Sequence, residues 1–85
     1  MINLEKKQIG KIAHFFPKIS VAVVELTGTL KVGDKISIEG HGGSFEQVVD
    51  SMQIEHEQLK EAKKGQSIGM RVSQPVKEGS LVFKV

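Results

Sequence analysis

One four-residue pattern occurs three times in this chain of 85 residues. It consists of an apolar residue, a lysine, a variable residue and a glycine, and its copies are Leu30–Gly33, Ala62–Gly65 and Val76–Gly79. Because glycine adopts positive φ angles at little cost, the pattern predicts a tight turn. We expect the apolar residue of each copy to anchor the turn in the core, and the lysine to face solvent. The repeat therefore indicates a fold with several similar corners.

Six segments around these turns have the composition and periodicity of β-strands. In residues 34–39, Ile36 and Ile38 share one face while polar residues occupy the other. In residues 44–55 neither face is purely apolar, which predicts a bulge or a bend. The expected strands are residues 8–16, 19–26, 34–39, 44–55, 67–72 and 81–85. Strands joined by short glycine-bearing turns predict an all-β domain, either a small antiparallel barrel or a sandwich.

Residues 55–65 do not follow the strand pattern. They are rich in strong helix formers and end with a glycine at a position typical of a helix C-cap. Their apolar stripe, however, consists only of Leu59 and Ala62, so a long helix would have little to bury. We expect a loop with at most one helical turn.

The length of the chain suits one domain, residues 1–85, with a single modest core. The sequence has no cysteine, which excludes disulfides and thiolate metal sites. It also has no signal-peptide pattern and no apolar run near the ~20 residues of a membrane span. These features predict a soluble cytoplasmic protein without membrane contact.

Charge is distributed unevenly along the sequence. Residues 1–20 carry four lysines and one glutamate, and residues 60–85 carry five lysines and an arginine against two glutamates. Residues 21–59 carry two lysines against seven acidic residues. If the two ends of the chain meet, they form a basic face that suits phosphate. The alternative is an ordinary solvated surface.

The sequence from residue 9 to residue 85 resembles the β-barrel second domain of translational GTPases. These include elongation factor Tu, the selenocysteine-specific elongation factor and bacterial initiation factor Two. The opening from Gly10, with the LKVGD turn at residues 30–34, is similar to the start of that domain. Met52-Gln53, the corner Ala62–Gly65, Ile68-Gly69-Met70 and the closing VKEGSLV are similar to its later part. Small stand-alone elongation factor-like proteins, and barrels appended to collagenase-like peptidases, are also similar.

This resemblance implies a closed six-stranded Greek-key β-barrel of the translation-factor domain II type. The chain contains no G-x-x-x-x-G-K-[ST] loop, so GTP binding by this chain alone is not expected. In elongation factor Tu the domain holds the aminoacylated end of tRNA through a glutamate and an arginine. Those positions fall on Gln53 and His56, so neither charge is kept.

Catalysis has little support in the sequence. Seven serines and three histidines are present, but no G-x-S-x-G elbow. His14, His41 and His56 lie too far apart for a metal motif. We therefore expect no enzymatic activity, no metal and no cofactor.

The stretch HFFPK, residues 14–18, is the most suggestive for binding. Adjacent residues of a strand point to opposite faces, so either Phe15 or Phe16 must face outward. An exposed aromatic ring beside lysines can stack on bases while the lysines contact phosphates. Alternatively, a loop or a chain end covers the outer ring.

Two functional hypotheses follow. The first is a non-catalytic, translation factor-like module that binds RNA, either tRNA or the ribosome, in the cytoplasm. Its RNA-binding residues would be Lys11, His14, Phe16, Lys18, Gln53, His56 and Arg71. The second is a protein–protein interaction module, related to barrels appended to collagenase-like peptidases, that docks through its acidic middle segment and Phe15 or Phe16. The sequence does not identify the partner or the oligomeric state.

Overall fold

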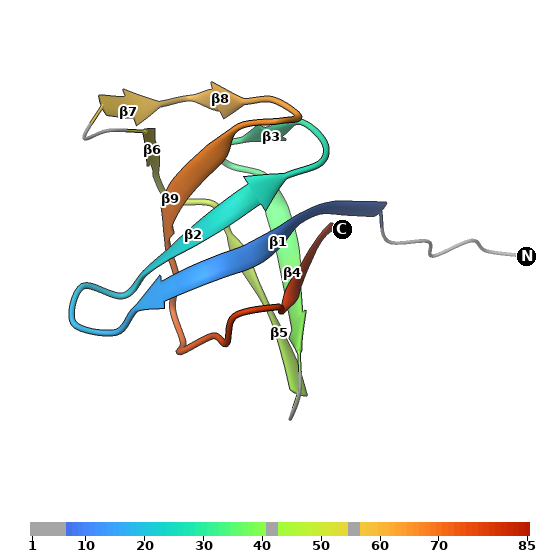
Figure 1. Ribbon diagram of the computed structural model, residues 1–85. Helices are drawn as coiled ribbons and strands as arrows, with labels where there is room; N and C mark the ends of the chain where they lie inside the picture. The colour runs from blue at the N-terminus through green and yellow to red at the C-terminus, as the bar shows by residue number, and fades with distance from the viewer. Residues whose placement is uncertain (1–6, 41–42, 55–56) are drawn as a thin grey trace, which may run out of the picture.

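The computed structural model describes residues 7–40, 43–54 and 57–85, and all regular elements within these ranges are β-strands (Figure 1). The predicted all-β class is therefore confirmed. The strands are β1 (Lys7–Phe16), β2 (Val21–Leu26), β3 (Leu30–Lys31), β4 (Lys35–Gly40), β5 (Gly43–Val48), β6 (Met52–Ile54), β7 (Glu57–Leu59), β8 (Glu61–Ala62), β9 (Ser67–Arg71) and β10 (Leu81–Lys84). None of the described segments forms a helix with the length and apolar character that a membrane span needs.

Eight strands form one antiparallel sheet in the order β5-β4-β10-β1-β2-β9-β6-β7, and β3 pairs with β8 in a second, two-stranded sheet. The large sheet curves so that one face surrounds the core (Figure 1). In β2 and β9 alternate residues are buried on this inner face, as period-2 side-chain alternation requires. The largest fully buried side chains are Ile9, Ile12, Val24, Leu30, Ile36, Val49, Met52, Ile68, Met70 and Val82.

The three copies of the repeated pattern form three similar turns. Their apolar residues, Leu30, Ala62 and Val76, are buried, and the lysines that follow are exposed. Gly33, Gly65 and Gly79 have φ angles of 98°, 92° and 90°. In each turn the residue after the glycine donates its N–H to the lysine carbonyl, at 3.0–3.1 Å. The predicted anchoring and the predicted glycine conformation are confirmed.

Each turn glycine also donates its own N–H to a distant strand or corner. The acceptors are the carbonyls of Val49, Leu26 and Ile12, at 2.8–2.9 Å. These hydrogen bonds fasten each corner to a distant part of the chain. The repeat is thus explained by folding alone.

The closed six-stranded barrel is wrong, because the sheet is open. β5 and β7 are its edge strands and do not pair with each other. The chain leaves strand geometry after Val48, and the peptide groups of Val49 bond to Gly33 and Asp34 at the β3–β4 corner. The next strand, β6, then pairs with β9 and β7. β5 therefore ends before its outer edge meets another strand.

A side chain bridges the open edge of β5. The Gln47 amide nitrogen donates to the carbonyl of Arg71 at 2.9 Å, and its oxygen accepts from the N–H of Ser73 at 2.9 Å. The Ser73 hydroxyl donates to the same oxygen at 3.2 Å. The Gln47 side chain thus ties β5 to the end of β9 at one point of an edge that otherwise has no strand partner among the described residues.

The region between residues 44 and 65 differs from the prediction in one respect and agrees in another. The expected bend is confirmed, because the single predicted strand divides into β5 and β6. The expected loop over residues 55–65 is wrong for its described part, which forms β7 and β8. Tertiary pairing overrides helix propensity here: Leu59 lies opposite Met52, and buried Ala62 lies opposite Leu30.

Candidate docking face

The outer face of β1, β2, β9 and β6 collects most of the residues that the sequence singled out. Strand register places His14 opposite Val23, Val23 opposite Gly69, and Gly69 opposite Gln53. A second row runs from Phe16 through Val21 to Arg71. Directly paired residues share one face of a sheet. We call this surface the Phe16 face; its residues are His14, Phe16, Val21, Val23, Gln53, Gly69 and Arg71.

A β-bulge at Ala13 decides which side chains reach this face. Ile12 lies opposite Val24 and His14 lies opposite Val23, so Ala13 is an extra residue in β1. With regular alternation through Ala13, His14 and Phe16 would point into the core on the side of buried Ile12. The bulge reverses this: Phe15 packs against the core and Phe16 faces outward.

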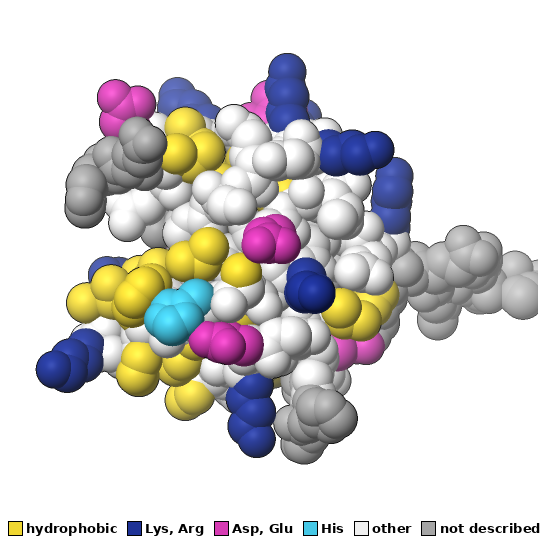
Figure 2. Space-filling view, viewed as in Figure 1, with side chains coloured by type: hydrophobic (Ala, Val, Ile, Leu, Met, Phe, Trp, Pro, Cys, Tyr) yellow, Lys and Arg dark blue, Asp and Glu magenta, His cyan; other side chains and the backbone are white. Residues whose placement is uncertain are grey.

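The exposed ring of Phe16 is the main apolar feature of this surface. Its exposed fraction is 44%, and Ile19, in the turn between β1 and β2, is 58% exposed. Figure 2 shows hydrophobic side chains gathered beside the histidine on this side of the molecule. The prediction that one of the two phenylalanines faces outward is confirmed. Within the described residues, no loop or chain end buries it.

His14 joins this face to the segment between β9 and β10. Its Nδ1 lies 2.8 Å from a carboxylate oxygen of Glu78, and both side chains are at least half exposed. The His14 and Phe16 ring centroids are 4.4 Å apart, with an edge-to-face interplanar angle of 65°. His14 therefore contacts both the Phe16 ring and the Glu78 carboxylate.

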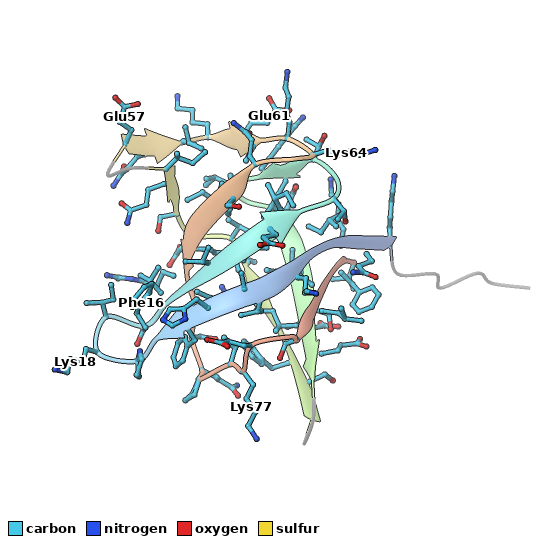
Figure 3. All side chains as sticks on the ribbon, in the orientation of Figure 1. Phe16, Lys18, Glu57, Glu61, Lys64 and Lys77 are labelled. Carbon is cyan, nitrogen blue, oxygen red and sulfur yellow. The ribbon has the colours of Figure 1, made fainter. Side chains whose placement is uncertain are left out.

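The remaining predicted residues lie at different distances from this centre. Lys18 is at the tip of the β1–β2 hairpin with Phe16 and points away from the sheet (Figure 3). Lys11 is exposed on β1 and pairs in register with Glu25 of β2, so an acid faces it from the next strand. His56 lies outside the described residues. Sequence reasoning missed Val21, Val23 and Gly69, because only strand register brings them beside Phe16.

The described residues provide neither a serine–histidine pair at His14 nor a cluster of metal ligands. His14 binds Glu78 and contacts Phe16, and no serine hydroxyl is its partner. In residues 7–40, 43–54 and 57–85, no group of three or more potential ligand side chains is placed to hold a metal ion. A groove of about 230 Å³ lies between the β4–β5 end and residues 74–80. A second, of about 380 Å³, lies between Val32 and the segments around Asp50 and Leu59.

Comparisons with known proteins point away from translation. No protein-family model matches the sequence. Over 79 residues the chain is 44% identical to an uncharacterized protease of Methanocaldococcus jannaschii, covering 92% of this chain. Over 82 residues it is 30% identical to a collagenase of Porphyromonas gingivalis, covering 94% of this chain. The chain spans only 19% and 23% of the length of these two relatives.

Solved structures agree with these relatives. The C-terminal domain of a Geobacillus thermoleovorans protein assigned as a U32 peptidase superposes with a TM-score of 0.87 at 21% identity. The match covers 92% of this chain and 99% of that domain. The chain has the fold of a U32 peptidase C-terminal domain. A second crystal structure of the same domain gives the same TM-score and identity.

The assignment to the translation-factor barrels, and with it to translation and elongation, is therefore wrong. The similarities are to part of a protease, part of a collagenase and a peptidase C-terminal domain. The repeated turns misled the interpretation because they specify a small curved β-sheet, and a fold does not determine a function. The comparisons favour the second hypothesis, a module of the kind appended to peptidases.

Proposed function

We propose that this chain is a non-catalytic protein-interaction module of the kind joined to peptidases, and that it docks onto a protein partner through the Phe16 face. The relatives named as proteases are four to five times longer than the segment they share with this chain, which leaves their catalytic residues room elsewhere. The described residues provide no nucleophile–base pair on His14. The cytoplasm is the proposed location.

The observation that supports this proposal most is the exposed apolar ring of Phe16 on a sheet face that also carries His14, Gln53 and Arg71. Aromatic residues and arginine are enriched among the residues that contribute most to protein interfaces. On this face Phe16 lies in one cross-strand row with Arg71, and Val21 lies between them. His14 and Gln53 supply polar groups beside the apolar centre. This combination suits a partner surface with an apolar pocket and a nearby carboxylate.

RNA binding by the basic and aromatic residues of the first hypothesis stays a prediction. Lys11, Lys18 and Arg71 would contact phosphates, and such contacts weaken steeply with salt. A protein interface centred on Phe16 depends mainly on apolar burial, which salt does not weaken in this way. The two hypotheses therefore differ in the salt dependence of binding. They also differ in the molecule that would be cross-linked to Phe16, which is RNA for the first and a protein for the second.

The test is photo-cross-linking of the full chain in cells that express it naturally. A photoreactive benzoylphenylalanine replaces Phe16 in one variant and Glu61 in a control, since Glu61 is exposed on β8 away from this face. We expect a discrete protein adduct from position 16 that resists RNase, and none from position 61. Mass spectrometry identifies the adduct, and a peptidase chain or peptidase domain is the expected product.

Arg71→Glu in the position-16 variant provides the second control. It should weaken the protein adduct while leaving the fold intact, because the Arg71 side chain is exposed and its carbonyl is what Gln47 binds. An adduct that disappears with RNase, or equal adducts from both positions, would contradict the proposal.

A further inference from the structure

The open edge of β5 forms a second binding feature, separate from the Phe16 face. β5 is the last strand of the large sheet, and its only strand partner within the described residues is β4. Across from its free edge lie residues 71–77, which run from the end of β9 toward β10. We call the space between β5 and residues 71–77 the seam. An unpaired strand edge presents a row of N–H and C=O groups that another strand can pair with.

Gln47 indicates what the seam binds. Its side-chain amide donates to the Arg71 carbonyl and accepts from the Ser73 N–H. A backbone peptide group of an inserted strand likewise offers an N–H donor and a C=O acceptor, the two kinds of group that Gln47 uses here. The far side of the seam is therefore already paired with an amide in the manner of a β-ladder.

Beyond Gln47 the seam widens into the groove of about 230 Å³. Gly43 and Ser44 line it from β5, and glycine leaves the backbone accessible to another chain. Phe45 and Val76 supply apolar surface on the two sides. From Gly43 to Glu46, short of the Gln47 bridge, the strand extends about 10 Å at 3.3 Å per residue, enough to pair with roughly three residues of an extended peptide.

Charge selects the occupant. Lys77 lines the groove, and none of the described residues that line it is acidic. Lys77 has no ion-pair partner within the described residues. Figure 3 shows Lys77 pointing outward from the segment before β10. An occupant with a carboxylate would therefore gain a favourable contact at this end of the groove.

We infer that the seam binds an extended polypeptide segment carrying a carboxylate, which adds to the sheet as a strand beside β5. Main-chain hydrogen bonds to the β5 edge provide affinity that depends little on sequence, and Lys77 provides the preference for acidic segments. Such a site suits a module that presents unfolded polypeptide to a peptidase. The inference holds whether or not the Phe16 face binds a partner.

The test uses the full chain, labelled with ¹⁵N, and two mixtures of hexapeptides. Both mixtures have acetylated N-termini and amidated C-termini and are randomised over uncharged residues at four positions; the other two positions are aspartate in one mixture and lysine in the other. We expect the acidic mixture at millimolar concentration to shift the amide signals of residues 43–46 and of Gln74, Val76 and Lys77 in a saturable way. The basic mixture should shift them far less.

Matched variants isolate the contribution of Lys77. Lys77→Glu should weaken binding of the acidic mixture about fivefold, as expected for reversing one exposed charge. Lys63→Glu is the control, because Lys63 holds the same place in another copy of the repeated turn and does not line the groove. It should change the affinity less than about twofold, and thermal unfolding should show both variants folded.

A third variant separates this inference from the proposed function. Phe16→Ser should abolish docking through the Phe16 face and leave peptide binding in the seam unchanged. Equal binding of both mixtures, shifts confined to the Phe16 face, or no shift with either mixture would each overturn the inference.

Discussion

The repeated turns and the β1–β2 hairpin tip each contain one residue with a positive φ angle, but they differ in that residue and in the burial of their apolar side chains. Each repeated turn buries its apolar residue and has a glycine at the position with positive φ. The hairpin tip exposes Phe16 and Ile19, and its residue with positive φ is Ser20, at 56°. Its carbonyl accepts a hydrogen bond from Val72, which holds this conformation. The turns with a buried apolar residue and a glycine at positive φ build the fold. The hairpin tip, which has neither feature, presents the candidate interface.

The largest expected effect concerns the buried anchors. Leu30→Ala should lower the free energy of unfolding by about 2–5 kcal/mol, because a fully buried leucine leaves a cavity. Ile19→Ala at the exposed tip should change it by about 0.5 kcal/mol or less. Urea unfolding followed by circular dichroism measures both. Similar losses for the two variants would show that the tip is part of the folded core.

A smaller effect is expected at the turn glycines. Gly65→Ala should destabilise the protein by about 1–2 kcal/mol, since alanine at a φ of 92° is strained although the space around it is open. Gly69→Ala is the control: its φ is ordinary, and its new Cβ would lie in normal contact with Val21 and Gln53. We expect it to be neutral or stabilising by up to about 1 kcal/mol. A neutral Gly65→Ala in the same unfolding measurement would remove the conformational explanation of the repeat.

The smallest expected effect is at Ser20, the residue with positive φ at the hairpin tip. Ser20→Gly should raise the free energy of unfolding by about 0.5–1 kcal/mol, because relief of the positive φ outweighs the entropy that glycine loses on folding. Ser67→Gly, in β9, has no strain to relieve and should instead be destabilising by about 0.5–1 kcal/mol. Differential scanning calorimetry of both variants decides the sign. Destabilisation by Ser20→Gly would mean that the serine side chain itself supports the tip.

Local features of this protein could be predicted from the sequence. The turns follow from the φ preference of glycine, and the outward position of one phenylalanine follows from side-chain alternation. The strands around Ile36 and Met70 follow from period-2 burial. Each of these depends on neighbours within a few residues along the chain.

Features that depend on distant contacts could not be predicted. The bridge from Gln47 to Arg71 and Ser73 joins residues 24–26 positions apart, and no local pattern marks it. β7 and β8 form because Leu59 and Ala62 find partners on other strands, against their helical surroundings. The Phe16 face itself depends on register across four strands. For this reason the sequence indicated several of its residues without indicating that they meet.

Because Ala13 is an extra residue in β1, this strand can lose one residue there without a change of register in the rest of the strand. In a regular strand, losing a single residue moves every side chain beyond it to the opposite face of the sheet, so most such deletions disrupt the core. Here a deletion at Ala13 would only straighten the strand, and Phe15 would remain inside while Phe16 remained outside. Among proteins that share this architecture, we expect differences in the length of the first strand to concentrate at this place.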